Sequence, residues 1–207
     1  MKKSRFIIAV LVVIFIGFTI SCEVEESGIG GDGTIEKKER IAKDFDSIVL
    51  DGVGDVYVYI AEDFKVEVMT DANLQSSVLT NVESNVLHIS LQFDTIIHAT
   101  MLEINVYLPE LKSISISKMG VGNIYVDNGK TQDLEITLAG TGHINTLSYE
   151  VENINISHTG VGSARIWATK SMRGVRSGVG DIWYKGHPEN NINSIGIRSV
   201  RPISGNP

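Results

Sequence analysis

The sequence predicts an all-β fold, a single-stranded β-helix or solenoid with coils of about 20 residues and a G-x-G turn in each coil. The first observation is a repeat whose leading glycines stand 20, 20 and 18 residues apart. The second is that apolar residues alternate on both sides of these turns with the period of two that is typical of strands. The repeated turns contain Gly120, Gly122, Gly140, Gly142, Gly160, Gly162, Gly178 and Gly180.

Each coil is expected to contain two strands with one apolar side turned inward. Before the turns, the spacing to the first glycine aligns two inward columns: Ile114, Leu134, Ile154 and Met172, then Ile116, Ile136, Ile156 and Gly174. After the turns it aligns two more: Ile124, Ile144, Ala164 and Ile182, then Val126, Thr146, Ile166 and Tyr184. Glycine in the turns permits positive φ and lets successive coils stack without a Cβ between them. Gly174 breaks its column, so a neighbour or a bulge is expected there. Breaks half-way round the coils are expected at 128–129, 146–148, 168–170 and 185–186.

The first half of the chain is less regular but also predicts strands, at 45–51, 55–61, 64–70, 86–92 and 102–108. Gly52 and Gly54 form a fifth copy of the turn. Residues 73–85 have apolar residues at helix-like spacing and are interpreted as a short helix or an irregular excursion. Gly186 is expected to end the last full coil, and 193–200 to be a degraded final copy that caps the stack.

The N-terminus predicts a lipoprotein. Three basic residues precede a short apolar run in residues 1–21, which is typical of a secretory signal peptide rather than a membrane span. The stretch before Cys22 resembles a lipobox, so Cys22, the only cysteine, is the expected lipidation site. Residues 22–43 are expected to form an acidic and Gly-rich tether, and 44–203 the β-helix domain. The protein would then be an outer-membrane lipoprotein of the cell envelope, with display at the surface favoured by the acidic residues after Cys22.

Charge disfavours nucleic acid as a partner. The full chain has a net charge of −7, and removal of residues 1–21, which contain three basic and no acidic residues, lowers it to −10. A surface of this sign matches neither nucleic acid nor anionic lipid.

The lipoprotein start, the segment 45–52, the segment 85–89 and the G-x-G series together resemble the putative auto-transporter adhesin, head GIN domain family. The resemblance covers roughly residues 44–203. It implies a single-stranded β-helix, no recognised catalytic set, a role in adhesion and assembly as a homotrimer. The chain departs from an autotransporter because the lipid would replace a C-terminal barrel as the anchor.

No catalytic residue, cofactor or metal site is predicted. The position after the second glycine holds mixed polar residues, which are interpreted as capping the turns; the residues are Asp55, Asn123, His143, Ser163 and Asp181. Calcium at Asp55 and Asp181 is a weaker alternative, and the histidines lack metal-ligand spacing. A β-helix carbohydrate-active enzyme remains an alternative, which a groove lined by acidic side chains would favour.

An outward column after the turns is the candidate binding or interface face. It contains Tyr57, Tyr125, Asn145, Arg165 and Trp183, with Tyr59 and Trp167 two residues further along their strands. Exposed rings, Arg and Asn favour a glycan ligand, a surface-protein ligand or a subunit interface. Packing of the rings on one another along the stack is the structural alternative. The predicted function is a non-catalytic, lipid-anchored adhesin, and the main alternative is an envelope scaffold that assembles with itself, which an apolar face repeated along the stack would favour.

Overall fold

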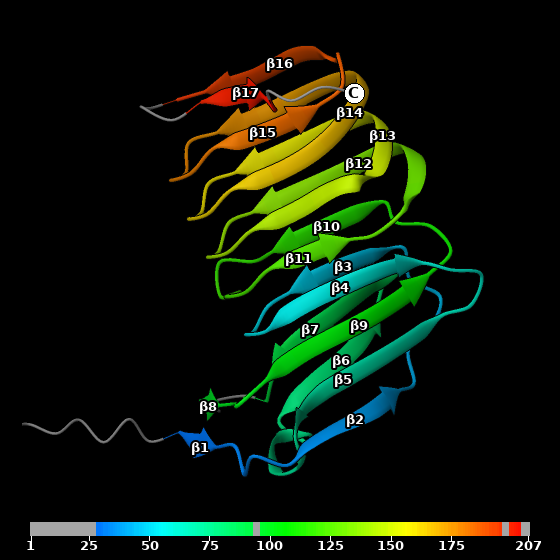
Figure 1. Ribbon diagram of the computed structural model, residues 1–207, viewed down its shortest axis with the longest axis vertical. Coiled ribbons are helices and arrows are strands. Elements are labelled where there is room, and N and C mark those ends of the chain that lie inside the picture. The colour runs from blue at the N-terminus through cyan, green and yellow to red at the C-terminus, as the bar shows by residue number, and fades with distance from the viewer. Residues whose placement is uncertain (1–27, 93–95, 196–198, 204–207) are drawn as a thin grey trace, which may run out of the picture.

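The computed structural model describes residues 28–92, 96–195 and 199–203. The predicted signal peptide, the predicted lipidation site Cys22 and the first residues of the predicted tether lie outside this described part. The fold is all-β, as predicted: one 15-stranded sheet curves into a nearly closed tube (Figure 1). A separate two-stranded sheet joins β1 (Ile29–Gly30) to β8 (Ile97–His98). No helix in the described part is long and apolar enough to cross a membrane.

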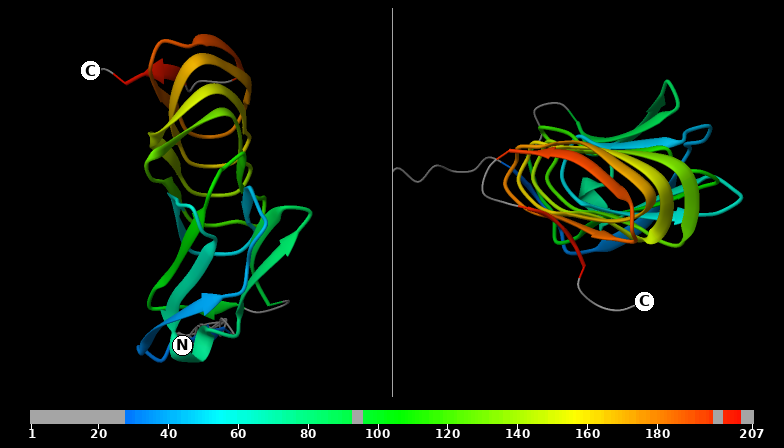
Figure 2. Two further views of the ribbon diagram at one scale, coloured as in Figure 1. Left: turned by 90° about the vertical axis from the view of Figure 1, so that its right-hand side faces the viewer. Right: turned by 90° about the horizontal axis from the view of Figure 1, so that it is seen from above.

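Two arms of strands enclose the core and run along the long axis of the molecule (Figure 1, Figure 2). In order along the axis, the first arm contains β2 (Ile35–Arg40), β5 (Lys65–Asp71), β9 (Leu102–Leu108), β4 (Asp55–Ile60), β11 (Ile124–Val126), β13 (Ile144–His158), β14 (Ala164–Arg176), β15 (Ile182–Lys185) and β17 (Val200–Pro202). The second arm contains β6 (Val78–Glu83), β7 (Val86–Leu91), β3 (Ser47–Leu50), β10 (Ser113–Ile116), β12 (Gly129–Leu138), β13, β14 and β16 (Glu189–Ser194). The long strands β13 and β14 belong to both arms, so the chain winds round the core from one arm to the other.

The register of the first arm agrees with the spacing of the repeats. Ile124 pairs in parallel with Ile144, Ile144 with Ala164, and Ala164 with Ile182, and all four side chains are buried. The residues between the turn glycines also bridge in parallel, in the order Val53, Val121, Thr141, Val161 and Val179. These bridges confirm that Gly52 and Gly54 flank a fifth copy of the turn.

On the second arm, the predicted alignment is wrong by two residues for the first copy. Ile114 pairs with Ile136 rather than Leu134, and Ile116 pairs with Leu138. The cause is a turn after β10, in which the amide of Gly120 donates to the carbonyl of Ser117 at 2.9 Å. This turn takes up two residues that the later copies lack.

Two of the predicted half-way breaks are not breaks. The strands β13 and β14 continue through 146–148 and 168–170. The repeat is 20 residues long before β14 and 18 after it, and this difference appears as register shifts between Thr146 and Asn153 where β13 pairs with β14. The additional residues place the ring of Tyr149 in the core, where its hydroxyl donates to the carbonyl of Leu111 at 3.1 Å. The backbone can bulge here without losing the sheet because only one residue at a time is left unpaired.

At Gly174 the predicted gap is closed by the backbone. Its φ is +134°, and a Cβ at this position would lie 1.9 Å from the carbonyl oxygen of Ile156 on the neighbouring strand. Glycine therefore allows β14 to approach β13 where a larger residue would collide with it.

The N-terminal end departs from the predicted parallel coils. Strands β2, β5 and β6 pair antiparallel with their neighbours, and β2 lies within 22–43, the range predicted as a tether. The short helix or excursion predicted at 73–85 is instead one 3-10 turn, η1 (Ala72–Leu74), followed by β6. The side chain of Gln75 donates to the carbonyls of Glu36 and Val68, so this turn holds β2 and β5 together over the end of the core.

The C-terminal end contains a further copy after Gly186, as predicted, but with other bounds. In this copy β16 pairs with β14 on the second arm and β17 pairs with β15 on the first. The segment 193–200 is therefore split between these two strands, with residues 196–198 outside the described part.

Candidate functional site

The predicted outward column lies in register along the first arm. Tyr57 pairs with Tyr125, Tyr125 with Asn145, Asn145 with Arg165, and Arg165 with Trp183. Their inward neighbours on the same strands are buried, so side-chain alternation turns this column outward. We call these five residues the aromatic face.

The tyrosine rings of this arm pack on one another rather than standing free. The rings of Tyr57 and Tyr125 stack at 5.1 Å between centroids and 16° between planes, and those of Tyr59 and Tyr107 at 4.9 Å and 20°. One side of each ring is therefore covered by its partner. The structural alternative weighed for these rings, packing along the stack, holds for both pairs.

The two tryptophans of the arm are covered by cations. The guanidinium of Arg201 lies 4.7 Å from the ring centroid of Trp183, and the ammonium of Lys185 lies 3.6 Å from that of Trp167. Such contacts attract a cation to the negative face of the ring. The surface therefore offers ring edges, hydroxyls and cations more than open ring faces.

The hydroxyls of Tyr57 and Tyr59 stay protonated at neutral pH, because the pKa of each is raised. Partial burial, followed by the nearby carboxylates of Glu103 and Asp55, raises the pKa of Tyr57, and burial followed by Tyr107 raises that of Tyr59. Their hydroxyl groups can donate as well as accept hydrogen bonds.

The polar column at the turns serves the backbone, as interpreted from the sequence. The amide of Asn123 donates to Asp55 at 2.9 Å, that of His143 to Asn123 at 3.0 Å, and that of Ser163 to Nδ1 of His143 at 3.0 Å. Asp181 accepts from the amide of Ser199 at 3.0 Å in the same way. In the described residues no group of three or more His, Cys, Asp or Glu side chains is placed to hold a metal ion.

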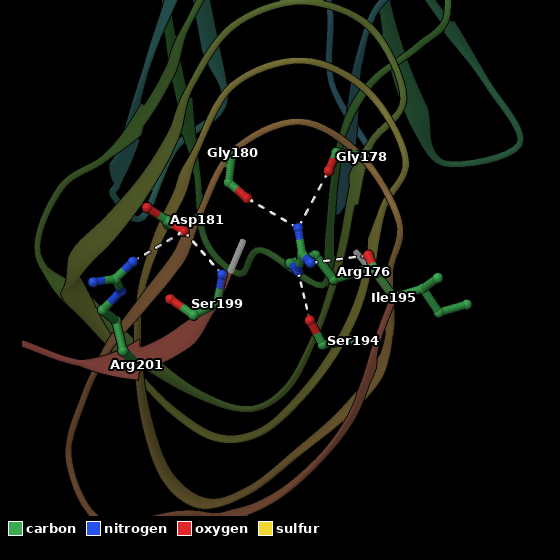
Figure 3. Close-up of polar contacts among 8 residues, drawn as sticks. All are labelled: Arg176, Gly178, Gly180, Asp181, Ser194, Ile195, Ser199 and Arg201. Carbon is green, nitrogen blue, oxygen red and sulfur yellow. Dashed lines mark hydrogen bonds and ion pairs between the residues drawn. The ribbon is translucent and has the colours of Figure 1, made fainter. Parts of the chain in front are cut away.

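A buried arginine near the last coil is a feature that the sequence analysis missed. Arg176 is 1% exposed and donates from Nε to the hydroxyl of Ser194 at 2.8 Å and from Nη2 to the carbonyl of Ile195 at 3.0 Å (Figure 3). Its Nη1 donates to the carbonyls of Gly178 and Gly180 at 3.2 and 3.3 Å. The residue two positions before the first turn glycine is Leu138 in one copy of the repeat, His158 in the next and Arg176 in the one after it. This change from an apolar to a polar residue in one column is the sequence signal that could have predicted a buried polar group.

A polar groove on the second arm was also missed. Its volume is about 910 Å³, and it crosses β12, β13 and β14. Its lining includes the acidic residues Glu110, Asp133, Glu135, Glu150 and Glu152, the basic residues Lys112, Lys130 and Arg173, and the amides Gln132, Asn153 and Asn155. Residue spacing does not reveal such a groove, because concavity is a property of the folded chain.

The family model described as putative auto-transporter adhesin, head GIN domain, matches residues 44–121 and again 113–188. Among solved structures, the fold is similar to a putative adhesin from Bacteroides fragilis NCTC 9343, with 20% identity, 85% of this chain and 100% of that chain covered, and a TM-score of 0.61. It is also similar to a putative lipid binding protein from Parabacteroides distasonis ATCC 8503, with 21% identity, coverage of 85% and 99%, and a TM-score of 0.54. Both similarities concern the fold. A comparison with curated proteins gives no significant match.

Proposed function

Because the chain belongs to the putative auto-transporter adhesin, head GIN domain family, we propose that it is a non-catalytic binding protein of the cell envelope that contacts glycans or surface proteins. Membership of an adhesin family supports a place at the cell envelope. The finer parts of the proposal are a signal peptide at 1–21, lipidation of Cys22, insertion in the outer membrane and a single-stranded β-helix as the binding domain. The basic and apolar N-terminus supports the first three, and the parallel pairs 18 to 20 residues apart support the last.

The observation that carries the function is the register of the aromatic face. Five strands that are consecutive along the arm place Tyr57, Tyr125, Asn145, Arg165 and Trp183 side by side on one surface. Aromatic residues and Arg contribute most to many protein interfaces, and neighbouring strands hold these residues about 4.8 Å apart without further ordering cost. Since one side of each aromatic ring is already covered by a stacked ring or a cation, the face suits a protein surface better than ring stacking on sugars.

The test of this face is binding by the full chain in detergent to glycans and to extracellular-matrix proteins immobilised on one array. The double variant Tyr125→Ser, Trp183→Ser is expected to bind its target about tenfold more weakly, because it removes two of the three aromatic side chains of the face. The control variant Ser115→Ala lies on the second arm and is expected to bind like the parent chain. Equal binding by the double variant and the parent would contradict the assignment of this face.

An envelope scaffold is the second candidate, and one feature of the surface favours it. The corner of the stack exposes apolar side chains in a row: Val121 is 49% exposed, Val161 51%, Val179 59% and Met119 77%. Apolar side chains repeated along one edge of a molecule are a common feature of surfaces that associate. A homotrimer formed through this edge would bury them.

Self-assembly is tested by the mass of the full chain in detergent, measured by sedimentation. If the corner is the interface, the variant Val121→Thr, Val161→Thr, Val179→Thr is expected to sediment as a monomer under conditions in which the parent is a trimer. Val175→Thr is the control, because Val175 is 41% exposed but lies on β14 and outside the bridged row of turn residues. A parent chain that is monomeric at all concentrations would exclude the scaffold.

A further inference from the structure

We propose that the polar groove on the second arm binds an uncharged, polyhydroxylated glycan chain that lies along the axis of the stack. The inference rests on the proposed function in one respect, namely that the protein binds a glycan at all. It adds a site on the arm opposite the aromatic face. The groove has a volume of about 910 Å³, which is large enough for several sugar rings.

The outward side chains of the groove form two rows that cross the strands. The first row contains Asp133 and Asn153, which are register partners on β12 and β13. Ser171, the register partner of Asn153 on β14, is not part of the lining but supports this row. The amide nitrogen of Asn153 donates to Asp133 at 3.2 Å, and the hydroxyl of Ser171 donates to Asn153 at 2.9 Å. This row is therefore ordered before any ligand arrives, which lowers the entropic cost of binding.

The second row contains Glu135, Asn155 and Arg173, which are also register partners. All three are exposed, and within the described part of the chain no other side chain bonds to their polar ends. A carboxylate accepts hydrogen bonds, a guanidinium donates them and an amide does both. Such a set matches the mixed donor and acceptor character of sugar hydroxyls, and a chain along the axis would meet a new pair of side chains about every 4.8 Å.

An aromatic platform lies at one end of the groove. A second hollow of about 340 Å³ shares Glu110 with the groove and is lined by Phe45 and Phe64. The two rings lie 5.1 Å apart, Phe45 is buried and Phe64 is half-buried. The accessible part of Phe64 can pack against the apolar side of a sugar ring, which the polar rows cannot do.

The charges of the groove select among ligands. Five carboxylates face three cations, so the groove would repel nucleic acid, anionic lipid and acidic polysaccharides. Hydrogen bonds to uncharged hydroxyl groups carry no such penalty.

The experiment is a titration of the full chain in detergent with uncharged polysaccharides and with an acidic polysaccharide as the comparison, followed by analysis of the sugar for shortened products. The double variant Glu135→Ala, Asn155→Ala is expected to bind the uncharged glycan at least about tenfold more weakly than the parent. Ser157→Ala is the matched control, because Ser157 lies outward on β13 but outside the groove, and it is expected to bind like the parent. Phe64→Ser is expected to weaken binding of long chains more than of short ones.

Three results would overturn the proposal. If the parent chain binds no uncharged glycan, the groove is not a glycan site. Capture of matrix proteins through the aromatic face would in that case still support the proposed function. Loss of glycan binding in Tyr125→Ser, Trp183→Ser but not in Glu135→Ala, Asn155→Ala would place the sugar on the aromatic face. Release of shortened products by the parent, lost in Glu135→Ala, would make the groove the active site of a carbohydrate-active enzyme.

Discussion

His158 and Arg176 are register partners on the neighbouring strands β13 and β14, and both side chains are buried inside the stack. Nε2 of His158 lies 2.9 Å from the carbonyl oxygen of Gly162 and donates to it, whereas Nδ1 has no partner in the described part of the chain. The next residue in this column, Ser194, accepts from Arg176 (Figure 3). The interior of the stack thus changes from aliphatic to polar over its last coils, with a neutral imidazole beside a permanent cation.

Acid is expected to destabilise the protein through His158. Burial lowers the pKa of His158 and outweighs the raising effect of the Gly162 carbonyl; the charge of Arg176 lowers the pKa further, and Asp181 raises it least. Below the ordinary histidine pKa of about 6.5, the unfolded chain therefore binds a proton that the folded chain does not, and the free energy of unfolding falls as the pH is lowered. Thermal unfolding at pH 7 and pH 5 should show a smaller loss for His158→Gln than for the parent chain. An identical loss in both would exclude His158 as the titrating group.

Removal of the buried arginine is expected to destabilise the last coils. Arg176→Met leaves the carbonyls of Gly178, Gly180 and Ile195 without their donor, at a cost of about 3 kcal/mol or more in the free energy of unfolding. Denaturant unfolding measures this loss. Arg173→Met is the control, because Arg173 is exposed on the same strand, and a change within about 0.5 kcal/mol is expected. Equal stability of the two variants would show that the network contributes little.

A methyl group at a stacked turn is expected to prevent close contact between coils. At Gly142, φ is +145° and a Cβ would lie 1.6 Å from the carbonyl oxygen of Gly122. Because that atom belongs to the backbone of the preceding turn, Gly142→Ala is expected to cost more than about 4 kcal/mol and to reduce the yield of folded protein. Gly30→Ala provides the control, since a Cβ at Gly30 meets no atom within 4 Å. Yield and melting temperature of the two variants decide the prediction.

The carboxylate of Asp71 is expected to hold the N-terminal segment on the stack. It accepts from the amide of Gly33 at 2.8 Å and from that of Thr100 at 2.7 Å. Burial acts to raise the pKa of Asp71, but these hydrogen bonds outweigh it and hold the pKa below its ordinary value. In Asp71→Asn, hydrogen exchange at Gly33 and Thr100 is expected to become faster while exchange in β13 is unchanged. Protection equal to that of the parent at both amides would contradict this role.

The repeats allowed much of the first arm to be predicted because their information is local. Glycine spacing placed the turns, and alternation placed Ile144 and Asn145 on opposite sides of one strand. The aromatic face followed from the same spacing. The spacing could not predict whether the aromatic rings are free or stacked. The stacking of Tyr57 on Tyr125 depends on side-chain rotamers and on pairing between residues 68 positions apart.

The sequence by itself determined the all-β class, the G-x-G turns and the inward and outward columns of the first arm, because a period of 18 to 20 residues brings equivalent residues together whenever the coils stack. Only the tertiary structure decided the antiparallel N-terminal end, the two-residue shift at Ile114, the burial of His158 and Arg176, and the polar groove. The physical reason is that a polar residue has the same sequence signature whether it faces water or hydrogen-bonds inside the core. Contacts between coils, which the linear pattern does not encode, make that choice.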